Sequence, residues 1–278
     1  MQNRKTTIIL LVSFFIGLSV LLYPSFSSYW NSKTQSKAIV DYEAMLASYK
    51  PEDYSDLFEA AERYNEALAK LNTPLREYKK LTEDYWNTLD VSGTGMIGYV
   101  TIPKIGQELP LYHGTSDAVL AIAAGHMEGT SIPVGGESIH SVVSAHRGLP
   151  TAVLFTYLDR MEVGDTFYFT ILDRTITYEV DQIRIVEPDD ASLIQIEDGR
   201  DYCTLLTCTP YGINTQRLLV RGHQIDASQK RNLYVAVEAY RVDTLVVMPM
   251  VALPIIFVLL CYVMLVPVKK ETLGEEPL

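Results

Sequence analysis

The sequence predicts a mostly β domain, folded as a closed or nearly closed barrel, that follows a helical region and lies between two membrane-spanning helices. Three observations support this expectation. The chain has uncharged segments from Thr6 to Ser32 and from Thr244 to Val268. Apolar residues recur at helical spacing before position 90, and short strands with turns follow position 96. Strands without long helices between them favour a barrel over a parallel sheet.

The first uncharged segment is predicted to be a membrane anchor. Its most apolar part is Ile8 to Leu22, and Tyr23 and Trp30 suit the membrane–water interface. The alternative is a cleaved signal peptide, because Arg4 and Lys5 supply a basic start. No small-residue cleavage pattern follows, which favours a retained anchor.

The second uncharged segment, 244–268, has the length of a membrane span. Its three prolines are tolerated in membrane helices. The alternative is a buried core helix, which rarely runs so long without a polar face. Lys269 and Lys270 follow it, and with Arg4 and Lys5 they predict that both termini lie in the cytoplasm. The residues between the spans would then face outward.

Residues 35–90 are predicted to be helical. One helix face is formed by apolar residues spaced four and three apart, namely Leu57, Ala61, Tyr64, Leu68 and Leu71. Pro51 precedes this helix, and Asn72-Thr73-Pro74 ends it.

The region from Met96 onward is predicted to hold the strands. The expected strands are Ile97–Ile102, Thr166–Leu172, Thr175–Ile183, Asp201–Cys208 and Arg217–Gln224, with a hairpin turn at Asp173-Arg174. Short helical stretches are expected at Asp117–Ala124 and Thr151–Leu158.

The composition excludes some functions. The net charge of −11 argues against nucleic acid as a partner, because phosphate binding requires clustered cations.

The cysteines are Cys203, Cys208 and Cys261. Cys203 and Cys208 share one strand, about 16 Å apart, beyond the reach of a disulfide. Free thiols are therefore expected.

Cys208 is the candidate nucleophile. It ends a strand, and Pro210 and Gly212 break that strand directly afterwards, so a substrate can reach the thiol. Cys203 faces the opposite side of the strand and is expected to be a buried residue. Arg217 opens the return strand and would lie beside Cys208, where a cation lowers a thiol pKa or stabilises an oxyanion. Arg221 shares that strand face and is an alternative.

A cysteine nucleophile needs a proton-transfer partner, usually a histidine. His146 follows the strand Ser141–Ala145 and precedes the turn Arg147-Gly148. His140 lies on the same strand face and remains an alternative. His113, His126 and His223 are the other histidines. No residues have metal-ligand spacing, and no glycine-rich phosphate loop precedes a helix, so no metal or cofactor is expected.

Longer strings resemble the sortases, cysteine transpeptidases of Gram-positive cell surfaces. Thr204-Leu-Leu-Thr-Cys208 followed by Arg217, and Ala145-His-Arg-Gly-Leu-Pro150, are similar to the family's signature segments. Tyr99–Gly114, Glu128–Gly136 and Thr207–Asn214 resemble class C, the pilin-polymerising sortases. The resemblance covers roughly residues 40–225.

The resemblance implies an eight-stranded sortase-type β-barrel with N-terminal helices. It implies His146, Cys208 and Arg217 as catalytic triad, and an LPXTG-type sorting signal cleaved between Thr and Gly through a thioester. A lysine amine of another pilin subunit would then accept the acyl group. The expected partners are pilin subunits and the membrane. The alternatives are a housekeeping sortase that anchors proteins to the cell wall, or an inert membrane scaffold.

The resemblance also implies a lid, here Thr73, Pro74 and Leu75. Class C lids commonly carry an Asp-Pro-aromatic motif, and this chain lacks both the acid and the ring. The expected organisation is a membrane anchor (1–32), a helical and lid region (33–95), a catalytic barrel (96–226), a juxtamembrane linker (227–243), a transmembrane helix (244–268) and a cytoplasmic tail (269–278). The protein would be a two-pass protein of the cell membrane, with its catalytic domain outside.

Overall fold

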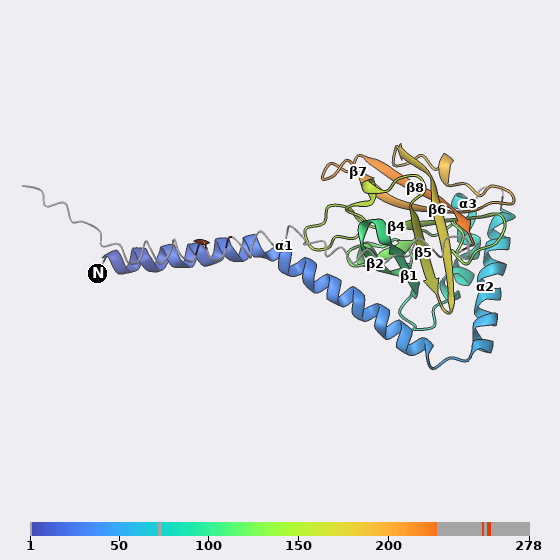
Figure 1. Ribbon diagram of the computed structural model, residues 1–278, viewed down its shortest axis with the longest axis horizontal. Coiled ribbons are helices and arrows are strands. Elements are labelled where there is room, and N and C mark those ends of the chain that lie inside the picture. The colour runs from blue at the N-terminus through green and yellow to red at the C-terminus, as the bar shows by residue number, and fades with distance from the viewer. Residues whose placement is uncertain (1, 72–73, 227–251, 253–254, 257–278) are drawn as a thin grey trace, which may run out of the picture. The chain divides into compact units, whose positions relative to one another are not determined.

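The computed structural model describes residues 2–71, 74–226, 252 and 255–256 (Figure 1). The chain divides into two compact units, one of Met1–Ser25 with Ala236–Leu278 and one of Phe26–Val235. The predicted linker, second span and cytoplasmic tail lie outside the described residues, apart from Ala252, Ile255 and Ile256.

The predicted N-terminal span is helical. It belongs to α1 (Gln2–Leu46), which continues through Pro24. Within the part of the chain that the structure describes, Ile8–Leu46 is the one helix long and apolar enough to cross a membrane. Large apolar side chains along it are exposed, including Ile8, Phe15 and Leu21. An apolar helix of this length fits a membrane anchor.

The helical region continues with α2 (Pro51–Ala69), α3 (Pro74–Glu77), the 3₁₀ helix η1 (Tyr78–Leu81) and α4 (Thr82–Asn87). The predicted apolar face of α2 is confirmed, because Ala61, Tyr64 and Leu68 are buried. The Asn65 side-chain amide makes two hydrogen bonds to the backbone of Ile132. Its Nδ2 donates to the Ile132 carbonyl at 2.9 Å, and its Oδ1 accepts from the Ile132 amide at 2.8 Å. These contacts fix α2 against the barrel.

The predicted barrel is closed, with the strand order β1-β2-β3-β4-β7-β8-β6-β5. Its strands are β1 (Met96–Ile102), β2 (Gln107–His113), β3 (Ala124–His126), β4 (Ile139–Ser144), β5 (Thr166–Ile171), β6 (Arg174–Val186), β7 (Asp201–Thr209) and β8 (Gln216–Ile225). The pairs β2–β3 and β4–β7 are parallel, and the others are antiparallel. The short helices are η2 (Pro103–Ile105), α5 (Asp117–Leu120), η3 (Leu158–Arg160) and η4 (Ser192–Ile194).

Three local predictions differ from the structure. The helix expected at Asp117–Ala124 ends at Leu120, and Ala124 begins β3. The β5–β6 turn is Leu172-Asp173 rather than Asp173-Arg174. Leu172 has a φ of 52°, and its amide donates to the Tyr42 hydroxyl of α1 at 3.1 Å. This contact between distant segments sets the turn. The predicted helical stretch Thr151–Leu158 is a series of turns that leads into η3.

Strand alternation separates two apolar clusters. Val143, Cys203, Leu205 and Val220 point into the barrel core, which confirms the expectation for Cys203. The residues that alternate with these core residues on β4, β7 and β8 face the outside of the barrel, where they form a second cluster. It consists of Val142, Ile194 and Leu219, with partly buried neighbours that include Leu75, Ala191, Leu193 and Leu206. We call this set the groove cluster.

Candidate active site

Cys208 and Arg217 are cross-strand partners. Their Cα atoms are paired in the antiparallel β7–β8 ladder, and Thr209 pairs with Gln216 at the end of the ladder. Directly opposed residues have their side chains on one face, with Cβ atoms about 5 Å apart. The predicted juxtaposition is therefore confirmed. Cys208 is a free, partly buried thiol.

The backbone brings His146 level with Cys208. In the parallel β4–β7 pair, Ser144 is the register partner of Leu206. The Ala145 amide donates to the Leu206 carbonyl at 3.2 Å, and the Thr207 hydroxyl donates to the Ala145 carbonyl at 2.8 Å. His146 follows Ser144 by two residues, as Cys208 follows Leu206, so both residues lie at the same end of the β4–β7 pair. We call Cys208, its cross-strand partner Arg217 and His146 the candidate catalytic row.

The segment after His146 is tied to the same end of β7. The Phe155 amide donates to the His146 carbonyl at 3.1 Å. The buried guanidinium of Arg147 pairs with Asp159 at 2.5 Å and donates to the Thr209 hydroxyl at 3.3 Å. Arg147 thus links His146 to the residue after Cys208. In the sequence, Arg147 belongs to a turn and to the segment Ala145–Pro150, and its position directly after His146 is the only local signal of this role.

The Arg217 guanidinium has room for a substrate. It donates to the carbonyls of Asn214 and Gln216, at 3.3 Å and 3.0 Å. No carboxylate ion-pairs with Arg217 in the described part of the chain. An arginine has five N–H donors, so several remain for a carbonyl or an oxyanion.

The two alternatives from the sequence have other partners. His140 is buried, with its Nδ1 2.7 Å from the Gln195 carbonyl and its Nε2 2.8 Å from the Thr204 hydroxyl. Burial lowers the pKa of His140 to about 4. Arg221 ion-pairs with Asp181 at 3.0 Å. Both side chains are engaged away from Cys208.

The remaining histidines are also separate from Cys208. His126 is completely buried, and its Nε2 is 2.8 Å from the Ser131 carbonyl. His113 is buried against Tyr85, and His223 is exposed. Among the described residues, no group of three or more His, Cys, Asp or Glu side chains is arranged to hold a metal ion.

Comparison with known proteins identifies the family of this fold. The sortase domain family matches residues 100–225. The structure resembles sortase C1 of Streptococcus agalactiae, with 47% identity and a TM-score of 0.64, over 68% of this chain and 98% of that one. This chain belongs to the sortase family. Its matched segment is the barrel that carries Cys208 and Arg217.

Two further class C sortases are similar. For sortase C of Streptococcus pneumoniae the identity is 45% and the TM-score 0.62, over 68% of this chain and 97% of that one. For Clostridium perfringens sortase C, solved with a C-terminal cell wall sorting motif, the identity is 42% and the TM-score 0.59. This match covers 69% of this chain and 99% of that one. The chain spans less than two thirds of the length of two curated relatives that it matches. It is 30% identical to Bacillus subtilis sortase D over 131 residues, which is 63% of that protein. The match to Streptococcus agalactiae sortase A covers 52% of that protein.

The groove cluster begins one row from Cys208. The β7–β8 ladder pairs Leu206 with Leu219 in the next row and Thr204 with Arg221 in the row after that. Ala191, Leu193 and Ile194, from the loop between β6 and β7, cover these rows. The sortase therefore has an apolar surface that starts beside its thiol.

The predicted lid is partly described. Thr73 lies outside the described residues, whereas Pro74 and Leu75 begin α3. Leu75 packs on the groove cluster. Leu75 therefore contacts an apolar surface on the strands that carry Cys208 and Arg217, and its role as a lid stays a prediction.

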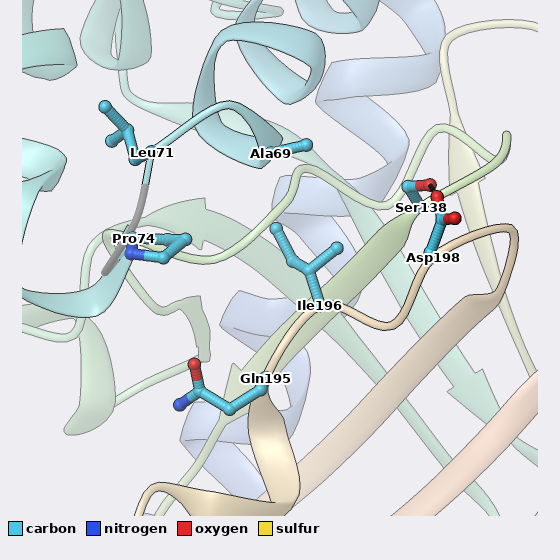
Figure 2. A pocket seen from close by; sticks show the side chains of 7 residues that line it. All are labelled: Ala69, Leu71, Pro74, Ser138, Gln195, Ile196 and Asp198. Atoms are coloured by element: carbon cyan, nitrogen blue, oxygen red, sulfur yellow. Dashed lines mark hydrogen bonds between the residues drawn. The ribbon is translucent and has the colours of Figure 1, made fainter.

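A cavity of about 290 Å³ lies between the end of α2 and the β6–β7 loop (Figure 2). It is lined by Ala69, Leu71, Pro74, Ser138, Gln195, Ile196 and Asp198. Ser138 and Asp198 precede β4 and β7, so these lining residues lie near the opposite end of the two strands from Cys208. Cys208, His146 and Arg217 do not line the cavity.

Buried histidines should make the sortase sensitive to acid. Burial lowers the pKa of His113 from 6.5 to about 4, so the unfolded chain takes up this proton at a higher pH than the folded chain. Its contribution to stability is therefore present above about pH 6.5 and is lost as the pH falls toward 4. The His113 ring is buried against the Tyr85 ring, so phenylalanine is the uncharged replacement of closest shape.

The free energy of unfolding of the wild type should fall between pH 7 and pH 5. We expect this fall to be about 2 kcal/mol smaller in His113→Phe. Urea unfolding of the detergent-solubilised chain at the two pH values measures this loss. The matched control is His223→Gln, because His223 is exposed. Equal losses for the wild type and His113→Phe would contradict the assignment of a buried neutral His113.

Proposed function

We propose that the protein is a membrane-anchored cysteine transpeptidase that cleaves LPXTG-type sorting signals and polymerises pilins. The proposal is supported by the candidate catalytic row, in which Arg217 is the cross-strand partner of Cys208 and His146 follows the end of the β4–β7 pair that leads to Cys208. A nucleophile, a proton carrier and an oxyanion donor are the groups that acyl transfer needs.

In the first step, the Cys208 thiolate attacks the carbonyl carbon of the signal's threonine. The negative charge that develops on the carbonyl oxygen is stabilised by the Arg217 guanidinium. The carbon–nitrogen bond then breaks, and His146 gives a proton to the departing glycine amine. The product is a thioester between Cys208 and the threonine carbonyl. It conserves the energy of the cleaved peptide bond, so no nucleotide is required.

In the second step, a lysine ε-amine of another pilin subunit attacks the thioester carbonyl. His146 accepts the proton that the amine loses. The carbon–sulfur bond breaks, which regenerates the Cys208 thiolate and leaves an isopeptide bond between the two subunits. Repetition of the two steps lengthens the polymer.

Pilins are the substrates that the class C likeness favours. The related Streptococcus pneumoniae enzyme is described in terms of pilin substrate specificity. The Leu75 contact with the groove cluster also fits a lidded, class C enzyme. A housekeeping sortase that uses a cell wall amine is the second candidate, because Streptococcus agalactiae sortase A is 30% identical over 130 residues.

The proposed location is the cell membrane, with both termini in the cytoplasm and the barrel outside. The apolar α1 supports the first span. The uncharged segment 244–268 and its flanking lysines support the second.

Incubation of the purified chain with a sorting-signal peptide and pilin subunits tests the function. Covalent pilin ladders, which Cys208→Ala does not produce, are the expected result. Cleavage with transfer only to wall-type amines would support the housekeeping sortase. Absence of both products, with an unreactive Cys208, would contradict both enzyme proposals.

We expect the lid to be weakly held, since its only described anchor to the groove cluster is the apolar Leu75. Leu75→Asp should increase the rate of Cys208 alkylation by a thiol reagent several-fold, because a carboxylate loses energy when buried on an apolar surface. Mass spectrometry follows the reaction. The matched control is Arg76→Ala, at an exposed residue of the same helix. Unaltered labelling of Leu75→Asp would contradict the lid assignment.

A further inference from the structure

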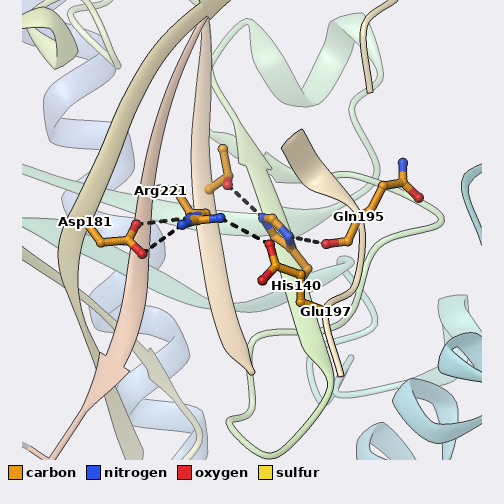
Figure 3. A network of polar contacts seen from close by, with 6 residues as sticks. His140, Asp181, Gln195, Glu197 and Arg221 are labelled. Carbon is orange, nitrogen blue, oxygen red and sulfur yellow. Dashed lines mark hydrogen bonds and ion pairs between the residues drawn. The ribbon is translucent and has the colours of Figure 1, made fainter. Parts of the chain in front are cut away.

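A polar network anchors the β6–β7 loop (residues 187–200) to the outer face of the barrel (Figure 3). The loop is held at two positions. The Gln195 carbonyl contacts His140 of β4, and the Glu197 carboxylate contacts Arg221 of β8 at 3.5 Å. The network therefore connects the loop to strands that also carry the catalytic row.

The geometry of His140 fixes the roles of its two nitrogens. A carbonyl oxygen only accepts hydrogen bonds, so Nδ1–H donates to Gln195. Nε2 then accepts from the Thr204 hydroxyl, 2.8 Å away. Both nitrogens of this buried, neutral ring are used, one for the loop and one for the barrel. A glutamine side chain cannot span both partners in the same geometry.

The Arg221 guanidinium is held equally firmly. Its Nε and Nη2 atoms form a bidentate pair with the Asp181 carboxylate, both at 3.0 Å. Its Cζ atom also lies 4.0 Å from the centre of the Tyr202 ring. Nη1 remains for Glu197. A lysine would keep the charge but lose the bidentate fork.

The anchored residues adjoin the groove cluster. Gln195 directly follows Ile194, which packs with Val142 and Leu219. Holding the Gln195 carbonyl therefore fixes where the Ile194 side chain lies. Thr204 and Arg221 lie four residues from Cys208 and Arg217 along their strands, about 13 Å away. The network therefore acts on the apolar surface of the groove cluster and does not contact the thiol.

We propose that His140 and Arg221 are positioning residues that hold the β6–β7 loop as the apolar wall against which the leucine of the sorting signal packs. The inference rests on the proposed function and deepens it, because it assigns selectivity for an apolar residue to two polar side chains that do not contact the thiol. Loss of either anchor lets Ile194 move, so binding and selectivity weaken while the chemical step is retained.

The test compares the full chain in detergent with His140→Gln and Arg221→Lys, using sorting-signal peptides that begin with leucine or alanine. We expect KM for the leucine peptide to rise about tenfold and kcat to stay within twofold. The preference for leucine over alanine in kcat/KM should fall by a similar factor. Iodoacetamide labelling of Cys208 should not change.

Arg174→Lys is the matched control, because Arg174 also combines an ion pair, with Glu62, and a ring contact, with Phe58, away from the loop. The inference would be overturned if His140→Gln and Arg221→Lys kept the wild-type KM and the wild-type preference for leucine. A lower kcat with unchanged KM and unchanged leucine preference would overturn it as well. If His140→Gln does not fold, Arg221→Lys decides alone. A wild-type chain that leaves the peptide uncut would contradict the proposed function itself, whereas normal cleavage by both variants contradicts only the inference.

Discussion

Cys208→Ala is expected to reduce sorting-signal cleavage by at least about 10⁴-fold, because no other group in the catalytic row can form the thioester. His146 and Arg217 would remain in place, yet without a nucleophile they stabilise a transition state that cannot form. The rate of release of the glycine-bearing fragment, followed by liquid chromatography, measures the effect.

Cys203→Ala is the matched control for this change. Cys203 is a free cysteine on the same strand, but its side chain is completely buried in the barrel core. Burial raises the pKa of its thiol, which disfavours the reactive thiolate. We expect this variant to lose about 1 kcal/mol of stability and to keep its turnover. Loss of activity in Cys203→Ala, or wild-type activity in Cys208→Ala, would contradict the assignment of Cys208 as the nucleophile.

Arg217→Ala is expected to lower kcat by about 10²- to 10³-fold, the effect of removing one oxyanion donor. The loss should be larger in kcat than in KM, because the charge on the carbonyl oxygen develops only in the transition state. Arg217→Lys should recover part of the rate, since it restores the charge without the planar fork. Initial rates over a range of peptide concentrations separate the two parameters.

Arg184→Ala is the control for Arg217→Ala. Arg184 is an exposed arginine on β6, and its register partner is Leu219 of β8, so it lies one strand away from the catalytic row. Its loss should leave kcat unchanged. Equal rates for Arg217→Ala and wild type would show that another group stabilises the oxyanion.

Local sequence patterns predict the part of the site that one hairpin builds. The strand that ends at Cys208 and the strand that begins at Arg217 are close in sequence, so a turn between them brings the two residues together. The barrel itself followed from short strands without long intervening helices. Cys203 was correctly placed in the core because side chains alternate along a strand.

Long-range contacts decide what those patterns leave open. His140 and His146 share a strand face, and the strand alone does not distinguish them. The difference comes from the β6–β7 loop, which covers His140 and supplies the Gln195 carbonyl. The β4–β7 pairing joins segments more than fifty residues apart, and the β5–β6 turn depends on Tyr42 in α1. Such contacts have no signal within a short window of sequence.

Intact-mass spectrometry of the chain after acid quenching during peptide cleavage shows whether Cys208 carries the acyl group. We expect a mass increase equal to the acyl fragment that ends in threonine, mapped to Cys208 and released by hydroxylamine. Cleavage without such an adduct, or with an adduct on another residue, would contradict it.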